Sequence, residues 1–403
     1  MSKLPDAEWR NRAGLVRLVD ALAGDSDTVR FVGGAVRDTL LGLPVSDVDL
    51  ATPLLPQVVV ARIEAAGIKA VPTGIDHGTV TAVSDGHPYE VTTLRRDVAT
   101  DGRRATVAYS GDWQEDAARR DFTINALYAD PATGELFDWF GGQADLQAGL
   151  VRFIGAPSQR IAEDNLRILR FYRFVARFGR GPLDAPSHRA VVAARHSLRT
   201  LSRERVADEL LKLLRLAAPL AMVQQMASDA VLTEVVAEAD GAAVQRLERL
   251  LANEVAARAV PDAGRRLAAL LPTAEAAVAL ASRLRLSNRL RERLAMLTAQ
   301  REAGLAMPVQ QLAYRIGTAA ARDCWLLGGD GPAMAGALGR LDGWQVPHFP
   351  VKGGALVARG VDKGPDVARL LRQIEAEWIA ADFPDGDQLA ALVDQALATE
   401  ARQ

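Results

Sequence analysis

The sequence VRFVGGAVRDTLLGLPVSDVDLAT, residues 29–52, decides the fold class and the chemistry that we expect. Residues 29–32 are mostly apolar and predict a buried strand, which Gly33 and Gly34 end in a tight turn. A helix follows directly, with Arg37 in its first turn. Because the free N–H groups at a helix start can hold a phosphate, and a guanidinium adds a fork of donors, this turn is a candidate phosphate site.

Two aspartates, Asp47 and Asp49, follow on a second predicted strand. Side chains at positions i and i+2 of a strand share a face, so the two carboxylates can converge on one site. Oxygen ligands beside a phosphate suit Mg²⁺. Each motif alone has a simpler interpretation, a plain turn or a solvated strand edge, but their order and closeness favour a phosphate site beside a metal-binding carboxylate pair.

The order of the predicted elements indicates an α+β protein. Short strand-like runs alternate with turns and helices up to about residue 150, which predicts a small mixed sheet rather than a long doubly wound one. Beyond residue 155 the strands fade and helical patterns dominate to the end of the chain. The candidate strands are residues 29–32, 48–51, 78–83, 89–93 and 135–137.

Composition is that of a soluble globular protein, with 403 residues, 49% hydrophobic and 24% charged, enough for two to four domains. Cys324 is the only cysteine, which excludes an intramolecular disulfide and a cysteine zinc cage. We find no signal peptide and no apolar stretch long enough to span a bilayer, so we expect a cytoplasmic protein without a membrane partner.

Charge is unevenly distributed along the chain. From Arg152 to Arg215 fourteen Lys or Arg stand against six Asp or Glu, in a chain whose net charge is −2. A basic central segment in a faintly acidic protein suggests a surface for a polyanion. Alternatively, these arginines are only the solvent-exposed residues of surface helices. The charge count alone does not decide between the two interpretations.

Two further motifs add candidate residues. Glu90 lies between apolar neighbours on a predicted strand and could form a third carboxylate of the site, able to help a metal or take a proton, or it could be an exposed glutamate. In RRDFTINALY, residues 119–128, Arg120 could reach a phosphate or sugar, and Asp121 could accept a hydrogen bond from a ribose hydroxyl. The simpler interpretation of Asp121 is a helix N-cap.

The sequence EDNLRILRFYRF, residues 163–174, predicts one continuous helix. Its charged positions recur every three residues, so they fan around the helix, and the last one, Arg173, points roughly opposite Asp164. An Asp/Arg pair at i, i+3 is usually a surface salt bridge. Alternatively, Asp164 and Arg167 together accept from an amino group and donate to a ring nitrogen, a pattern that suits cytosine or adenine.

Taken together, GGAVRD…DVD, RRDFTINA and EDNLRILR resemble the bacterial type of CCA-adding tRNA nucleotidyltransferase and its relative, poly(A) polymerase. The resemblance covers roughly residues 29–52, 73–93 and 119–178. It implies that Gly34 and Arg37 contact the nucleotide triphosphate and that Asp47 and Asp49 bind catalytic Mg²⁺. It also implies a ribose site at Arg120 and Asp121. By the same resemblance, Asp164 and Arg167 would select CTP and then ATP. Arg170 and Arg173 would support the bound nucleotide.

The resemblance also implies an architecture and a reaction. The catalytic head would span residues 1–150, a helical neck with the base-recognition helix 151–220, a helical body 221–320 and a helical tail 321–403. The tRNA acceptor end would lie along the basic neck and the tail would bind the tRNA. The tRNA 3′-OH would attack the α-phosphate in line and release pyrophosphate.

Three alternatives remain at this stage. A poly(A) polymerase would carry a Gly-Arg-Arg-Phe element where this chain has PTGIDHGTVTAV, residues 72–83. An enzyme that adds only CC would lack a mobile loop, which we predict at residues 95–116 with Asp101, Arg103 and Arg104. A tRNA-binding protein with an inactive head would have lost site residues, whereas all of them are present.

Overall fold

The computed structural model describes residues 3–23, 28–101, 104–362 and 364–400. The chain divides into two compact units, residues 1–235 and 236–403. The first unit holds the sheets and the second is helical, so the predicted α+β class with helices after the head is confirmed. The finer division into head, neck, body and tail stays a prediction.

A seven-stranded mixed sheet forms the centre of the first unit, in the order β3-β4-β5-β2-β1-β8-β9. All five predicted strands form within two residues of the expected bounds. The sequence did not predict β3 or β8. The strands are β1 (Arg30–Val32), β2 (Asp49–Thr52), β3 (Lys69–Gly74), β4 (Thr79–Ser84), β5 (His87–Thr93), β8 (Tyr128–Ala129) and β9 (Leu136–Phe137).

The pairing of β2 positions the predicted carboxylates. β2 runs antiparallel to β1, with Val32 opposite Asp49, and parallel to β5, with Asp49 opposite Glu90. Paired residues on neighbouring strands face the same side of a sheet, so the side chains of Asp49 and Glu90 lie next to each other. Asp47 lies two residues before β2, outside the strand on which we expected it.

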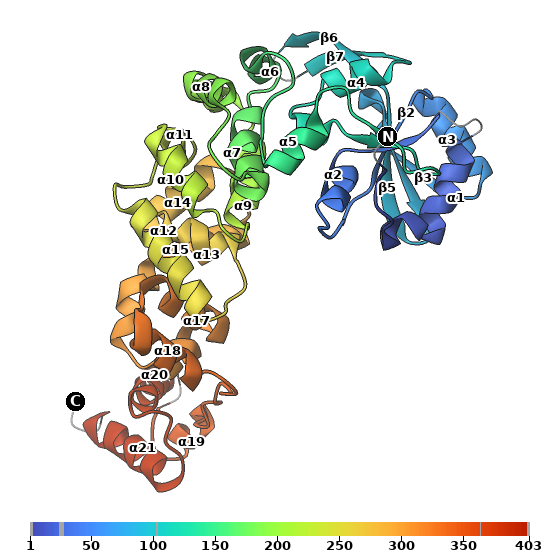
Figure 1. The fold of residues 1–403 in the computed structure, drawn as a ribbon. Helices are drawn as coiled ribbons and strands as arrows, with labels where there is room; N and C mark the ends of the chain where they lie inside the picture. Colours follow the sequence, from blue (N-terminus) through green and yellow to red (C-terminus); the bar gives the residue numbers. More distant parts are fainter. Residues whose placement is uncertain (1–2, 24–27, 102–103, 363, 401–403) are drawn as a thin grey trace. The chain divides into compact units, whose positions relative to one another are not determined.

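Two helices cover one part of the sheet. Figure 1 shows α1 (Ala13–Leu22) and α3 (Pro56–Ala65) lying together beside the strands, and both pack on β4. The short helix α2 (Gly34–Leu40) starts at the glycine turn after β1, as predicted. The other helices of this region are α4 (Trp113–Ala118) and α5 (Gly142–Ala148).

Residues 95–101 and 104–109 form two paired strands within the segment predicted as a loop. β6 (Arg95–Asp101) and β7 (Arg104–Tyr109) pair antiparallel in a two-stranded sheet of their own, with Asp101 opposite Arg104. Arg103 lies outside the described residues. The sequence did not predict this strand pairing, because the polar stretch has no core-facing alternation. The mobility of residues 95–116 stays a prediction.

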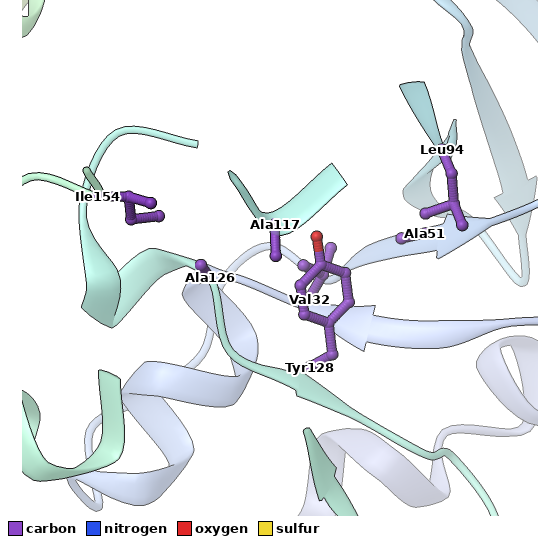
Figure 2. Packing of buried hydrophobic residues seen from close by; sticks show 7 residues of the cluster. All are labelled: Val32, Ala51, Leu94, Ala117, Ala126, Tyr128 and Ile154. Atoms are coloured by element: carbon purple, nitrogen blue, oxygen red, sulfur yellow. The ribbon is translucent and has the colours of Figure 1, made fainter. Parts of the chain in front are cut away.

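A cluster of small and apolar residues joins the sheet to α4 (Figure 2). It contains Val32 and Ala51 from the central strands, Ala117 from α4, Ala126 and Tyr128 from the RRDFTINALY motif, with Leu94 and Ile154 at its ends. The Tyr128 side chain is fully buried here, and Trp113 and Trp139 pack edge-on against its ring. The cluster thus fixes the motif against the sheet.

Helices complete the first unit. α7 is the central one and buries Ile168, Phe171, Tyr172 and Phe174, with Phe122 of the motif packed against Phe171 and Phe174. These contacts set α7 beside the RRDFTINALY motif. The helices are α6 (Pro157–Glu163), α7 (Arg167–Phe178), α8 (Ala185–Ala193), α9 (Arg203–Leu214), α10 (Leu220–Ser228) and α11 (Leu232–Val235).

The second unit is helical throughout its described residues. Its early helices share a buried ion network in which Glu254 accepts from Arg265 and Arg266, and Arg265 also bonds Asp323. Its late helices pack around Leu356, Leu370 and Ile374. The helices are α12 (Ala243–Ala256), α13 (Ala263–Ala269), α14 (Ala274–Arg283), α15 (Asn288–Ala303), α16 (Val309–Ile316), α17 (Thr318–Gly328), α18 (Gly331–Arg340), α19 (Gly353–Val357), α20 (Pro365–Ala380) and α21 (Gly386–Glu400). In the part of the chain that is described, no helix combines the length and apolarity needed to cross a membrane.

Candidate active site

A polar cavity of about 390 Å³ lies in the first unit, at the glycine turn after β1. It brings together predicted residues that are far apart in the sequence. Asp47, Glu90 and Arg173 are not among the residues that line it. Of the predicted site residues, the cavity is lined by Gly34, Arg37, Asp49, Arg120, Asp121, Asp164, Arg167 and Arg170.

The glycine turn requires a residue without a side chain. Gly33 has φ +67° and ψ −117°, a conformation that L residues rarely adopt, and α2 begins at the next residue. Arg37 is buried under this turn, where Nε donates to Asp38 Oδ1 at 2.7 Å and Nη1 donates to Asn125 Oδ1 at 2.5 Å. Desolvation lowers the pKa of Arg37, although Asp38 opposes the change. The fork of Arg37 is therefore mainly held by protein groups, and its positive charge remains beside the cavity.

The carboxylates form a negatively charged group at the edge of the cavity. Burial, together with the nearby charges of Glu90 and Asp47, raises the pKa of Asp49 to about 6, although Arg120 opposes the change. The pKa therefore reflects the desolvation of Asp49 first and the negative charge beside it second. Asp47 and Glu90 are both exposed and can accept a ligand from solvent.

This arrangement fits a divalent cation shared with a substrate. Within the described residues, no three His, Cys, Asp or Glu side chains converge closely enough to hold a metal ion among themselves. Mg²⁺ is commonly held by one or two carboxylates, substrate phosphates and water, so a complete protein cage is not needed. Asp49 with Asp47 would supply the carboxylates, and the glycine turn would receive the phosphates.

Asp121 is saturated by protein donors. Its Oδ1 accepts from the N–H of Phe122 and from Asn125 Nδ2, and its Oδ2 accepts from Arg170 Nε at 2.8 Å and Nη2 at 2.6 Å. Burial would raise its pKa, but Arg170 and these hydrogen bonds hold the pKa at about 2. A ribose hydroxyl could bond Asp121 only by displacing or sharing one of these donors. The expected helix after Asp121 is a single 3₁₀ turn, Thr123–Asn125.

Asp164 and Arg167 lie on the cavity, but not on one helix. α6 ends at Glu163, Asp164 has extended backbone angles, and α7 starts at Arg167. The predicted continuous helix was therefore wrong, because the Asp164 carboxylate bonds the N–H of Leu166 and turns the chain. The directions around one helix that we derived for these charged side chains therefore do not hold for Asp164.

Other charged residues hold this pair in place. Arg167 donates through Nη1 to Glu163 Oε2 at 2.8 Å and through Nη2 to the carbonyl of Arg119 at 2.9 Å. Asp164 Oδ2 accepts from Arg205 of α9 at 2.7 Å. Asp164 and Arg167 thus each bond a different partner. They do not form the direct salt bridge that the simpler interpretation predicts.

Arg173 points away from the cavity. Its Nε donates to Glu209 Oε2 of α9 at 2.6 Å, and Arg170 Nη1 lies 3.6 Å from the same carboxylate. Sequence reasoning missed Glu209 and Arg205, because both approach α7 from a helix more than thirty residues later. It also missed Asn125, whose spacing of four residues from Asp121 within one motif was a usable signal.

Comparison with known proteins agrees with this site. The chain matches two family profiles, "Poly A polymerase head domain" over residues 29–152 and "Probable RNA and SrmB- binding site of polymerase A" over residues 183–241. The mitochondrial CCA tRNA nucleotidyltransferase 1 of Mus musculus is 34% identical over 391 residues, which cover 93% of this chain and 89% of that protein. The chain belongs to the CCA tRNA nucleotidyltransferase family. The family resemblance expected from the motifs is confirmed.

Solved CCA-adding enzymes share the fold of this nucleotidyltransferase. The Bacillus stearothermophilus CCA-adding enzyme in complex with CTP has a TM-score of 0.77 and 26% identity, covering 97% of this chain and 98% of its own. The Thermotoga maritima CCA-adding enzyme complexed with tRNA has a TM-score of 0.72 at 22% identity, covering 99% of this chain and all of its own. Among curated bacterial relatives, the CCA-adding enzyme of Geobacillus thermodenitrificans is 42% identical over 186 residues, 46% of this chain and 45% of that enzyme. Nucleotidyltransferases of this family generally use a divalent metal ion.

Proposed function

We propose that this nucleotidyltransferase adds CCA to the 3′ end of tRNA from CTP and ATP, without a nucleic-acid template. The observation that supports this most is the cavity itself. One polar cavity combines a phosphate-type turn at Gly33, a carboxylate at Asp49, and the donor–acceptor set of Arg167 and Asp164. The full-length relationship to a CCA tRNA nucleotidyltransferase supports the same reaction.

The triphosphate is assigned to the glycine turn. The N–H groups at the start of α2 and the charge of Arg37 favour phosphate there, and Gly34 leaves room for its close approach. Asp47 and Asp49 are the proposed Mg²⁺ ligands, with Glu90 beside them as a further carboxylate. A bound Mg²⁺ would lower the pKa of the attacking 3′-OH and neutralise charge on the departing pyrophosphate.

The nucleoside is assigned to the other polar residues that line the cavity. Arg120 and Asp121 are the proposed sugar-side residues, and Asp164 with Arg167 would recognise the base. A carboxylate acceptor beside a guanidinium donor matches the amino group and ring nitrogen that cytosine and adenine present, and it opposes the carbonyl of uracil or guanine. Arg170 supports Asp121 through a bidentate hydrogen bond, and Arg173 acts farther away through Glu209.

The tRNA is assigned to the basic helical segment and the second unit. The excess of eight positive charges between residues 152 and 215 suits the acceptor end, which carries one phosphate per nucleotide. In the predicted division, residues 1–150 would bind the nucleotide, 151–220 would hold the base and the acceptor end, and 221–320 and 321–403 would carry the rest of the tRNA. We place this reaction in the cytoplasm, which the lone and buried Cys324 supports, since secreted proteins commonly use disulfides.

The decisive experiment extends a tRNA that lacks its 3′ CCA, with CTP, ATP, both, or UTP and GTP. Growth by C, C and A followed by arrest is the expected result. A long adenosine ladder would indicate a poly(A) polymerase, arrest after two cytidines with both substrates present would indicate a CC-adding enzyme, and no extension would indicate a tRNA-binding protein.

Matched variants test the metal assignment in the same assay. We expect Asp47→Ala and Asp49→Ala to abolish extension while retaining tRNA binding in a filter assay, because removal of either carboxylate weakens the cation site. Glu64→Ala removes an exposed acid of α3 that does not line the cavity, and this variant should extend tRNA like the wild type. Full activity of either aspartate variant would contradict the assignment.

A further inference from the structure

The guanidinium of Arg120 is held by a closed triangle of hydrogen bonds. Arg120 Nε donates to the Tyr128 hydroxyl at 2.9 Å, and Arg120 Nη2 donates to Asp116 Oδ2 at 3.1 Å. The Tyr128 hydroxyl in turn donates to the same Asp116 oxygen at 2.5 Å. The three groups are therefore linked pairwise, and neither nitrogen can move without breaking a bond to a buried partner.

The third nitrogen of Arg120 is directed to the cavity. Nη1 lies 3.5 Å from the position that a Cβ on Gly33 would take, next to the turn where α2 begins. Across the described ranges no residue accepts a hydrogen bond from Nη1. Arg120 and Asp49 both line the cavity. Two donors are thus fixed by protein, and one faces the nucleotide site.

Tyr128 is suited to fix this geometry because its side chain is fully buried and packed. Its ring is fully buried between Trp113 and Trp139. Figure 2 shows its oxygen on the side of the cluster that faces α4, the helix that carries Asp116 and Ala117. Two arginines hold the pKa of the Asp116 carboxyl at about 2 although burial opposes this, so the acceptor of the triangle is charged at neutral pH.

We propose that Tyr128 is a positioning residue for nucleotide binding, whose hydroxyl, together with Asp116, fixes Arg120 so that Nη1 donates to an oxygen of the bound nucleotide. This inference rests on the proposed function, since it assumes that CTP or ATP occupies the cavity. It adds a group that does not line the cavity and acts only through Arg120. The oxygen could belong to the sugar or to the phosphates, and the experiment separates the two.

The test compares two tyrosines that each donate a hydrogen bond to a carboxylate within the first unit. Tyr128→Phe removes the hydroxyl from the triangle, whereas Tyr172→Phe removes one that donates to Asp229 at 2.7 Å, away from the cavity lining. CTP binding to the full-length protein is measured by calorimetry with Mg²⁺ and without tRNA. We expect Tyr128→Phe to weaken CTP binding about tenfold and Tyr172→Phe to change it less than about twofold. Wild-type affinity in Tyr128→Phe, or equal losses in both variants, would overturn the inference.

A double-mutant cycle tests whether Tyr128 acts through Arg120. Lysine at position 120 keeps the charge but cannot form the three-nitrogen geometry, so Tyr128→Phe should cost nothing further in an Arg120→Lys background. A full tenfold loss in that background would contradict the mechanism. If Tyr128→Phe weakened CTP binding only by destabilising the protein, the loss of affinity would be the same with arginine or lysine at position 120.

Nucleotide analogues identify the oxygen that Nη1 contacts. If the effect of Tyr128→Phe vanishes with 2′-deoxy- or 3′-deoxy-CTP, the partner is that sugar hydroxyl. If it persists with both but vanishes with cytidine, which has no phosphate, the partner is a phosphate. An effect that persists with all of them would overturn the inference. Failure of the wild type to extend tRNA while it binds CTP would refute only the proposed function, and absence of CTP binding would refute both.

Discussion

Replacing Arg170 with methionine should destabilise the first unit in a strongly pH-dependent way. Arg170 joins α7 to the RRDFTINALY motif through two hydrogen bonds to Asp121 Oδ2. Methionine keeps an apolar side chain beside Phe174 and removes the guanidinium, which pairs with Asp121 and, at 3.6 Å, with Glu209. The Asp121 side chain is only 8% exposed, and the carboxylate would therefore lose its main cationic partner inside the protein.

The magnitude follows from the pKa of Asp121. Burial would raise this pKa, yet Arg170 and the hydrogen bonds lower it from an ordinary 3.8 to about 2. At ~1.36 kcal/mol per pKa unit, the charged carboxylate contributes about 2 kcal/mol to the free energy of unfolding at neutral pH. Without Arg170 the burial effect dominates and the pKa rises, so the variant should lose at least that much, and about 3 kcal/mol is expected.

The pH window follows from the direction of the shift. A carboxyl with a depressed pKa stabilises the folded state fully above its unfolded pKa, and this stabilisation is lost as the pH falls from about 4 through about 2. The gap between wild type and Arg170→Met should therefore be largest at pH 7 and shrink by about 1 kcal/mol or more by pH 3.

The assay is urea unfolding at pH 7, 5, 4 and 3, followed by circular dichroism. Arg199→Met serves as the control, because Arg199 pairs with Glu234 from an exposed position, where solvent screens the pair and its contribution to stability is small. A gap for Arg170→Met that is the same at pH 7 and pH 3, or smaller than that of the control, would refute the reasoning.

Two other predictions concern base choice and packing. Arg167→Lys keeps a charge but loses the planar donor set fixed by Glu163, so the preference for CTP over UTP in tRNA extension should fall by about tenfold, and unchanged selectivity would count against base recognition by Arg167. Gly142→Ala should lower the free energy of unfolding by more than about 2 kcal/mol, because its Cβ would lie 2.3 Å from the Thr123 carbonyl oxygen. Gly155→Ala, with a positive φ but open space, should cost only about 1 kcal/mol in the same urea titration, and equal losses would argue against the steric explanation.

The sequence predicted best those elements whose signals are local. The apolar run before Gly33, the glycine turn and the helix after it all form within one or two residues of expectation, because strand burial and glycine conformation are encoded in adjacent residues. The placement of Asp49 beside Glu90 also follows from two strand patterns, although only the structure gives their parallel register.

The base-recognition segment was mispredicted for a physical reason. EDNLRILRFYRF has an uninterrupted helical pattern without proline or glycine, and nothing in it marks a break at Asp164. The break depends on a local hydrogen bond to Leu166 and on Arg205, forty-one residues later. Long-range partners of this kind, Glu209 among them, cannot be derived from the spacing of a single motif.

The self-contained pairing of β6 and β7 has a consequence for how enzymes of this kind can diversify. Since β6 and β7 form a sheet of their own, a change in the length of these two strands need not shift the register of the seven central strands. Doubling the length of a connecting segment adds only about 0.6 kcal/mol of closure entropy. Chimaeras that exchange residues 95–109 between homologues should therefore fold. This segment is the place where function can change while the central sheet stays the same.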